Sequence, residues 1–257
     1  STFTLPSAPT KSGFDFLGWQ LNSNNYAAGS TFTMSDTSIT FTAQWSGVYY
    51  AITYALNGGA GATPTQADVA SGGSFTSAAA PTRSGYDFDG WSDGVDTVTA
   101  TTAVTNVSSN KTLTAQWKIA KPGTPGIPTV VPGSGSATIT VVPPSTGGTP
   151  TSYTVTAGDS SGVALSPAKT CTVTAPATSC TISSLTNGTS YTFSSTATNS
   201  AGSSTSASAA SSAVTPANIP SEPLSVSGSG TGGSANVSWS VPNSNGGSAI
   251  TDYIIEY

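Results

Sequence analysis

The sequence predicts a mainly β chain built from tandem repeats. Apolar and polar residues alternate in several short runs, among them 39–45, 237–241 and 253–257. A period of two places the apolar residues on one face of a strand, where they can be buried together. Good helix formers are scarce, because the 257 residues include 8 Leu and 7% charged residues, whereas Ser and Thr number 87. Threonine is β-branched and polar, so it suits the solvent face of a sheet.

A first repeat has a period of 72 residues. Residues 9–19 (PTKSGFDFLGW) return as residues 81–91 (PTRSGYDFDGW). Thr-Ala-Gln-Trp at 42–45 returns at 114–117 with the same offset. An offset that holds over this stretch without an insertion indicates two copies of one structural unit.

The two copies differ at their beginnings. The second opens with a predicted strand at 50–56 that runs into an Asn-Gly-Gly turn, and the first has no such strand. We therefore expect a partial unit at 1–45 and a complete one at 46–117.

A different pattern follows, and proline-rich segments at 118–127 and 216–223 predict linkers. Between them, about six alternating runs over 128–215 predict a seven-stranded sandwich. Residues 224–257 repeat the beginning of this pattern with a period of 98 to 100 residues and supply half a sandwich. A half-sandwich cannot bury its inner face. We therefore expect further chain or a neighbouring molecule to complete the units at both ends.

The first pattern resembles a known family. The motif Pro-Thr-(Lys/Arg)-Ser-Gly-(Phe/Tyr)-Asp-Phe-x-Gly-Trp, ending in Thr-Ala-Gln-Trp, is similar to the InlB B-repeat, or Listeria–Bacteroides repeat, of bacterial surface proteins. The resemblance covers residues 1–117 and implies small β-grasp-like units.

The second pattern resembles the fibronectin type III domain over residues 122–217. The segment LTNGTSY, from Leu185 to Tyr191, is similar to the tyrosine corner of that sandwich. Trp239 keeps the tryptophan of that family in the next copy, whereas the matching residue of the first copy is Val141. Both resemblances imply spacer and interaction modules of secreted or wall-attached bacterial proteins.

The five tryptophans are candidate structural residues. Trp19 matches Trp91, Trp45 matches Trp117, and Trp239 stands alone in the second pattern. Recurrence in each module is typical of a core, and a buried aromatic ring removes up to ~250 Å² from water in these Leu-poor units. The alternative is a set of platforms on which carbohydrate rings stack.

Four acidic residues lie within ten positions, namely Asp87, Asp89, Asp93 and Asp96. Carboxylate oxygens so close in sequence are candidate Ca²⁺ ligands. Their spacing does not follow a Ca²⁺-loop signature, and only Asp87 has a counterpart in the first copy. A solvated acidic turn is therefore the favoured interpretation, with no metal site.

Two kinds of covalent crosslink are compatible with the sequence. Cys171 and Cys180 bracket a predicted strand-turn-strand segment, which favours a disulfide and an oxidising compartment over two free buried thiols. Lys111 and Lys118 are conceivable partners in Lys–Asn isopeptide bonds, although no sequence pattern supports either.

The composition excludes several classes of function. The chain has no His, which rules out Ser-His-Asp or Cys-His catalysis and His-ligated metals. Six Lys and Arg, none beyond Lys169, do not make a nucleic-acid groove. No apolar run is long enough to insert into a membrane. We expect no enzyme and no cofactor.

The sequence therefore favours a non-catalytic segment of a large secreted or cell-wall-attached bacterial surface protein. It would act as a stalk or adhesion array in the extracellular space, at the cell surface or cell wall. Its partner would be an unidentified protein or glycan, or other copies of itself. Two alternatives remain open: an accessory spacer or carbohydrate-binding region of a secreted polysaccharide-degrading enzyme, and a subunit of an extracellular filament or surface layer.

Overall fold

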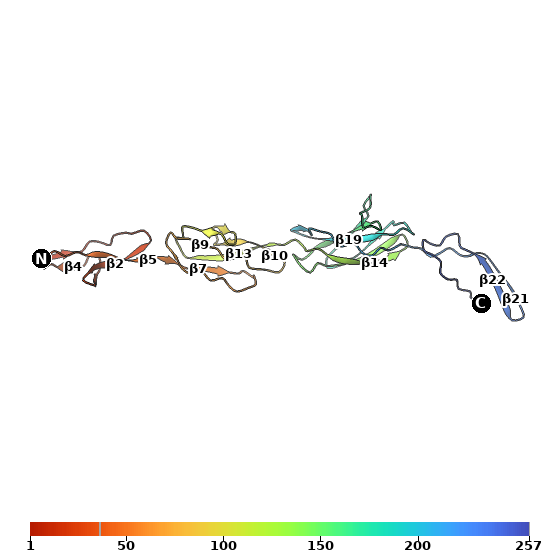
Figure 1. Ribbon diagram of the computed structural model, residues 1–257, viewed down its shortest axis with the longest axis horizontal. Helices are drawn as coiled ribbons and strands as arrows, with labels where there is room; N and C mark the ends of the chain where they lie inside the picture. Colours follow the sequence, from red (N-terminus) through yellow and green to blue (C-terminus); the bar gives the residue numbers. More distant parts are fainter. Residues whose placement is uncertain (36, 257) are drawn as a thin grey trace. The chain divides into compact units, whose positions relative to one another are not determined.

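The computed structural model describes residues 1–35 and 37–256, which form strands and no helix. Figure 1 colours the strands by their place in the sequence. The described chain divides into two compact units, one made of Ser1–Arg83 and Asp87–Lys118 and the other of Ser84–Tyr86 and Ile119–Tyr257. The prediction of a mainly β fold is confirmed.

The described residues of the first repeat form five strands: β1 (Thr2–Thr4), β2 (Phe14–Leu21), β3 (Asn24–Tyr26), β4 (Thr31–Thr33) and β5 (Thr42–Gly47). β1 pairs with β4, and β3, β2 and β5 form a three-stranded antiparallel sheet. The alternation over 39–45 predicts a longer last strand than the structure has, because β5 begins at Thr42.

The second repeat contains eight strands: β6 (Tyr49–Tyr50), β7 (Ile52–Ala55), β8 (Val69–Ala70), β9 (Phe75–Thr76), β10 (Tyr86–Ser92), β11 (Thr97–Val98), β12 (Ala103–Val104) and β13 (Lys111–Ile119). Its main sheet has the order β11-β10-β13-β7, and β7 runs parallel to β13. The copies share their register, since Phe3 opposite Phe32 becomes Phe75 opposite Val104.

A glycine in the middle of the central strand is required in both copies. The pairing of β2 with β5 shifts between Phe16 and Gly18, and Gly18 has a φ of 138°. Gly90 occupies the same place in β10 with a φ of 118°. A Cβ atom on Gly90 would lie 2.6 Å from the Thr97 side chain and 2.9 Å from the Val98 carbonyl oxygen. No other residue fits both the conformation and the space.

The core of the second repeat lies on one face of its sheet. Trp91 and Val107 are fully buried, and Ile52, Tyr54 and Leu113 are almost so. Thr53 alternates with Ile52 and Tyr54 along β7 and faces solvent, as the period-two pattern predicts.

The sandwich contains seven strands: β14 (Gly126–Gly133), β15 (Ser136–Val142), β16 (Ser152–Gly158), β17 (Thr170–Thr174), β18 (Ser179–Ser183), β19 (Thr192–Asn199) and β20 (Gly202–Ser203). They form two sheets, β14-β15-β18 and β17-β16-β19-β20. Ile139, Val155 and Phe193 are fully buried between them. β14 begins inside the segment expected to be a linker, and as an edge strand it tolerates Pro128.

A last hairpin, blue in Figure 1, joins β21 (Leu224–Thr231) to β22 (Ser234–Ser240). Its register copies that of β14 and β15 at an offset of 98 residues, since Thr129 opposite Thr140 becomes Ser227 opposite Ser238. The alternation over 253–257 predicts a further strand. This prediction is wrong for the described residues, because residues 251–256 form no strand. The matching strand β16 is held by β17 and β19, and the described part of 224–256 offers no such neighbours. Tyr257 lies outside the described residues.

We predict that Gly90→Ala destabilises the second repeat by about 2–4 kcal/mol, from a left-handed backbone and a collision with β11. Gly61→Ala is the matched control, because Gly61 has a φ of 116° and a Cβ atom added there would meet nothing within 4 Å. Gly61→Ala should lower the free energy of unfolding only by the cost of the left-handed backbone, about 1–2 kcal/mol. Urea unfolding, with the 50–118 transition assigned by hydrogen exchange, measures both. Equal losses would contradict the prediction.

Candidate functional site

The predicted acidic residues do not gather into a metal-binding cluster in the described part of the chain. No three acidic or cysteine side chains of the described residues come together in a way that could hold a metal ion. Within the same residues, no helix has the length and apolar character needed to cross a membrane.

The acidic turn is organised around Asp93. Its carboxylate forms an ion pair with Lys111, and its Oδ1 accepts hydrogen bonds from the backbone N–H groups of Val95 at 3.1 Å and Asp96 at 2.9 Å. The Lys111 hydrogen bond, helped by these two N–H groups, holds the pKa of Asp93 well below its usual range. The oxygens of Asp93 are thus used by the protein itself.

The other predicted Ca²⁺ candidates do not join Asp93 in a metal site. Asp89 lies 3.4 Å from Lys118, and both side chains are more than half exposed, so solvent screens this pair. Asp87 and Asp96 contribute no carboxylate to a cluster with them. Both lysines considered for isopeptide bonds, Lys111 and Lys118, face aspartates in ion pairs.

Trp19 and Trp91 occupy equivalent positions with equivalent contacts. The Trp91 Nε1–H donates to the carbonyl oxygen of Ala78 at 2.9 Å, and that of Trp19 donates to Pro6 at 3.1 Å. Trp91 is fully buried, with Tyr54 of β7 packed edge-on against it at 4.8 Å between ring centroids. Trp19 is half-buried, because the described part of the first repeat has no strand in the place of β7.

Trp45 and Trp117 also match. Phe16 packs against Trp45 at 5.6 Å, and Phe88 against Trp117 at 5.7 Å, both edge to face. The Trp117 Nε1–H donates to the carbonyl oxygen of Leu56 at 3.2 Å. Both indoles are half-buried within their own module. These contacts favour the core interpretation of the tryptophans over carbohydrate platforms.

The structure joins Cys171 and Cys180 in a disulfide, with their Cα atoms 6.1 Å apart. Cys171 lies on β17 and Cys180 on β18, and these strands belong to different sheets. The bond therefore ties the two layers of the sandwich together, where the sequence suggests a crosslink across a single turn.

The predicted tyrosine corner is formed by Tyr191. Its hydroxyl oxygen accepts a hydrogen bond from the backbone N–H of Thr186 at 3.1 Å. Leu185 is buried in the sandwich core, as is Val141, the residue at the usual tryptophan position. The smaller Val141 side chain belongs to the same buried cluster as Tyr153 and Phe193.

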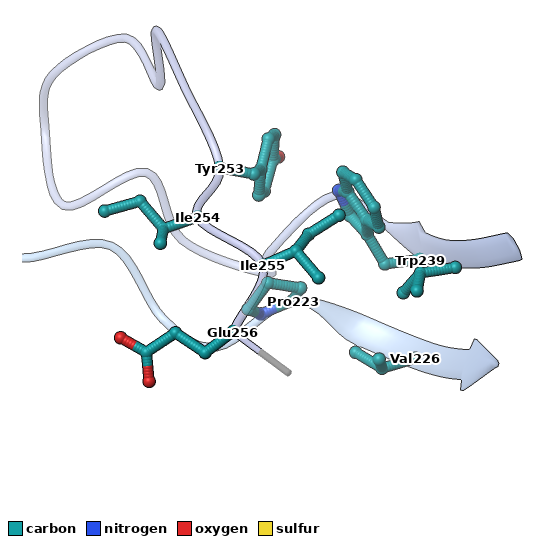
Figure 2. Close-up of a pocket in the computed structure, with 8 residues that line it drawn as sticks. Pro223, Val226, Trp239, Tyr253, Ile254, Ile255 and Glu256 are labelled. Carbon is teal, nitrogen blue, oxygen red and sulfur yellow. The ribbon is translucent and has the colours of Figure 1, made fainter. Parts of the chain in front are cut away.

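Trp239 borders an apolar hollow of about 280 Å³ in the last described segment. Figure 2 shows Tyr253, Ile255 and Pro223 facing Trp239, with Ile254 and Glu256 turned away. Trp239 packs against Tyr253 at 5.2 Å and is only half-buried. In the complete sandwich the matching face of β14 and β15 packs against the opposite sheet, which contains β16 and β19. The hollow is thus the inner face of a sandwich rather than a shaped ligand site.

Sequence reasoning missed one pairing. β7, where the chain enters the main sheet of the second repeat, lies directly beside β13, where it leaves. The two are parallel over four residue pairs, from Ile52 opposite Lys111 to Ala55 opposite Thr114. No turn signal links strands so far apart in sequence. The shared alternation of the two segments was the only available hint.

Comparison with known families matches this organisation. Residues 1–44 and again 50–116 match the Listeria-Bacteroides repeat domain. Residues 123–214 match the fibronectin type III domain.

Two relatives come from Evansella cellulosilytica and carry the provisional names of a membrane protein and a Gly-rich membrane protein. The first is 34% identical over 122 residues, which is 46% of this chain and 18% of the relative. The second is 31% identical over 114 residues, or 42% of this chain and 13% of the relative. The chain thus spans less than a fifth of the length of either relative.

Similar solved structures include the FN1–FN3 domains of chicken CNTN1, at 19% identity, a TM-score of 0.33, and coverage of 46% of this chain and 42% of that one. A fibronectin type III domain of human collagen alpha-1(XX) is 25% identical, with a TM-score of 0.30 and coverage of 41% and 93%. Titin kinase with its flanking domains is 26% identical, with a TM-score of 0.31 and coverage of 37% and 17%. TM-scores this low carry no argument about function.

We predict that the Cys171→Ser, Cys180→Ser double variant loses roughly 2–3 kcal/mol of sandwich stability, the chain-entropy value for a loop of this length. Denaturant unfolding with and without a reductant measures the loss. Reduction should leave the 1–118 unit unchanged, because both cysteines lie outside it. A free-thiol assay that labels both cysteines in the native, non-reduced chain would contradict the bond.

We predict an acid-dependent contribution from Asp93. A carboxyl whose pKa is lowered by folding stabilises the folded state above its unfolded pKa of about 3.9, and loses that effect as the pH falls towards the folded value. The stability difference between the native chain and Asp93→Asn should therefore be largest above about pH 5 and shrink towards pH 2. Asp89→Asn is the control and should change the stability little, because solvent screens the exposed Asp89–Lys118 pair. Identical profiles for the two variants would refute the assignment.

Proposed function

Because the chain joins Listeria-Bacteroides repeat domains to a fibronectin type III domain, we propose that it is the stalk of a bacterial surface protein. The stalk is extracellular, non-catalytic and made of modules that hold other parts of the protein away from the cell. The family matches themselves make the chain a modular segment of repeat and fibronectin type III domains.

The observation that carries the proposal is repetition of geometry without added chemistry. The first unit repeats its strand register at 72 residues and the second at 98 residues. Side chains that recur with the repeat are packing residues, such as Trp19 and Trp91. The acidic turn does not recur, and its central carboxylate is paired with Lys111. A spacer needs only modules whose cores repeat. An active site does not need such repetition.

Two further observations support an extracellular location. The Cys171–Cys180 disulfide persists in oxidising compartments. The two relatives carry names that place them at a membrane. If the stalk also has an adhesive role, it binds a protein or glycan ligand. If it self-associates, copies of the chain contact one another.

We predict that an epitope inserted between Ser160 and Ser161 of the parent protein is accessible to antibody on intact cells. Both residues lie in an exposed turn between β16 and β17, so the insertion should leave the sandwich folded. Permeabilised cells serve as the control for total protein. Labelling only after permeabilisation would overturn the extracellular assignment.

A domain exchange separates a stalk from a ligand-binding array. Replacing residues 118–215 of the parent protein with an unrelated sandwich of equal length should keep distal parts displayed, whereas deletion should reduce their display. Binding of the purified chain to a glycan or matrix protein, lost on the exchange, would favour the adhesive or enzyme-accessory alternative instead.

A further inference from the structure

We propose that the parallel β7–β13 pair is a mechanical clamp that makes the second repeat resist tension along the chain. The inference rests on the proposed stalk function for the origin of the tension. It follows from topology: the chain enters the sheet at the start of β7 and leaves it at the end of β13, and the two strands are neighbours.

The direction of loading follows from the parallel pairing. A pull on the preceding chain draws β7 backwards along its axis, and a pull on the following chain draws β13 forwards. Parallel strands under these opposed pulls slide past each other. The bonds of all four residue pairs, Ile52–Lys111 to Ala55–Thr114, are then strained together. An antiparallel hairpin pulled at its two free ends would instead open one bond at a time.

Polar contacts extend the pair beyond its first residues. The Lys111 N–H donates to the Ala51 carbonyl oxygen at 2.9 Å, and the Ala51 N–H donates to Asn110 Oδ1 at 2.9 Å. On the solvent face, the hydroxyls of Thr53 and Thr112 lie 2.9 Å apart. Each of these bonds joins one strand or its flank to the other, so each opposes sliding.

The far end of the pair is fixed by side chains. The Asn57 Nδ2 donates to the Ala115 carbonyl oxygen at 3.0 Å, and the Trp117 Nε1–H donates to the Leu56 carbonyl oxygen at 3.2 Å. A Cβ atom on Gly59 would lie 2.7 Å from the Trp117 ring, so the turn after β7 fits closely under that indole. The contacts at both ends therefore add to the bonds that sliding has to break.

The buried face shields the clamp from water. Ile52 and Tyr54 of β7 and Leu113 and Ala115 of β13 are all buried in the same core. Sliding by one residue would turn these side chains to the opposite face, because side chains alternate along a strand. Movement along the strand axis therefore breaks the hydrogen bonds and the packing together.

The first repeat provides an internal comparison. β5 corresponds to β13, and its sheet in the described residues has the order β3-β2-β5, with no strand in the place of β7. The two outer strands of this sheet, β3 and β5, both pair antiparallel with β2. The described part of residues 1–47 therefore contains no clamp of this kind.

Optical-tweezers experiments on the full chain test the clamp in two directions. Handles on Tyr49→Cys and Lys118→Cys load β7 and β13 in shear, whereas handles on Tyr49→Cys and Ser109→Cys peel them apart from one end. All three residues are exposed, and the native cysteines are bonded to each other. The unfolding force should be on the order of threefold higher in shear, because four residue pairs resist together instead of in turn. Equal forces would overturn the proposal.

Matched variants locate the effect. Thr112→Val removes the Thr53 contact and should lower the shear force while leaving the peeling force unchanged. Thr97→Val makes the same change on the exposed edge strand β11, away from β7, and should alter neither force. If both substitutions lowered the shear force equally, the resistance would reflect general stability and not the clamp.

Pulling the unmodified chain by its ends needs no cysteine and covers the case in which a handle variant does not fold. Residues 1–47 should extend at lower force than residues 50–118, identified by a length gain of about 3.4 Å per residue. The reverse order would overturn the proposal. If the shear force exceeds the peeling force but the epitope is not labelled on intact cells, the clamp is supported and the stalk function is wrong. If the epitope is labelled but the two forces are equal, the stalk function is supported and the clamp is wrong.

Discussion

The contact on which the repeat module depends is the edge-to-face packing of Phe88 against Trp91 and Trp117. Ring centroids lie 5.3 and 5.7 Å apart, and the first repeat has the same contacts at 5.3 and 5.6 Å. The chain has only 8 Leu, and the core of the second repeat includes the large rings of Tyr54, Phe75 and Trp91 beside its aliphatic side chains. The glycine at position 90 and the acceptor at Ala78 are arranged around these rings.

The equivalence of the two copies could be predicted from the sequence, because the motif residues are themselves the core. The 72-residue offset correctly pairs Trp19 with Trp91, and the structure gives both the same kind of acceptor. The β7–β13 pairing could not be predicted, since nearly 60 residues separate strands that no local turn connects. Alternation identifies a strand's buried face but not its neighbour. For the same reason, alternation over 253–257 predicted a strand that has nothing to pair with in the described chain.

The crosslink and the acidic turn show a related limit. The spacing of Cys171 and Cys180 indicates that they can meet, but two strands nine residues apart can form a hairpin or belong to opposite sheets. Which of these occurs depends on β15 and β16, far away in sequence. Likewise, closeness of four aspartates in sequence does not bring their oxygens together. Asp93 instead turns towards Lys111 on a different strand.

The differences between the copies show where a module begins. Trp91 is fully buried because Tyr54 covers it, whereas Trp19 has the same motif contacts and stays half-exposed. The motif alone therefore builds a sheet, and a preceding strand is needed to close the core. The second family match starts at residue 50, just before that strand. The strand that closes the core is also the one through which tension enters the module, so burial and mechanical resistance depend on the same four residue pairs.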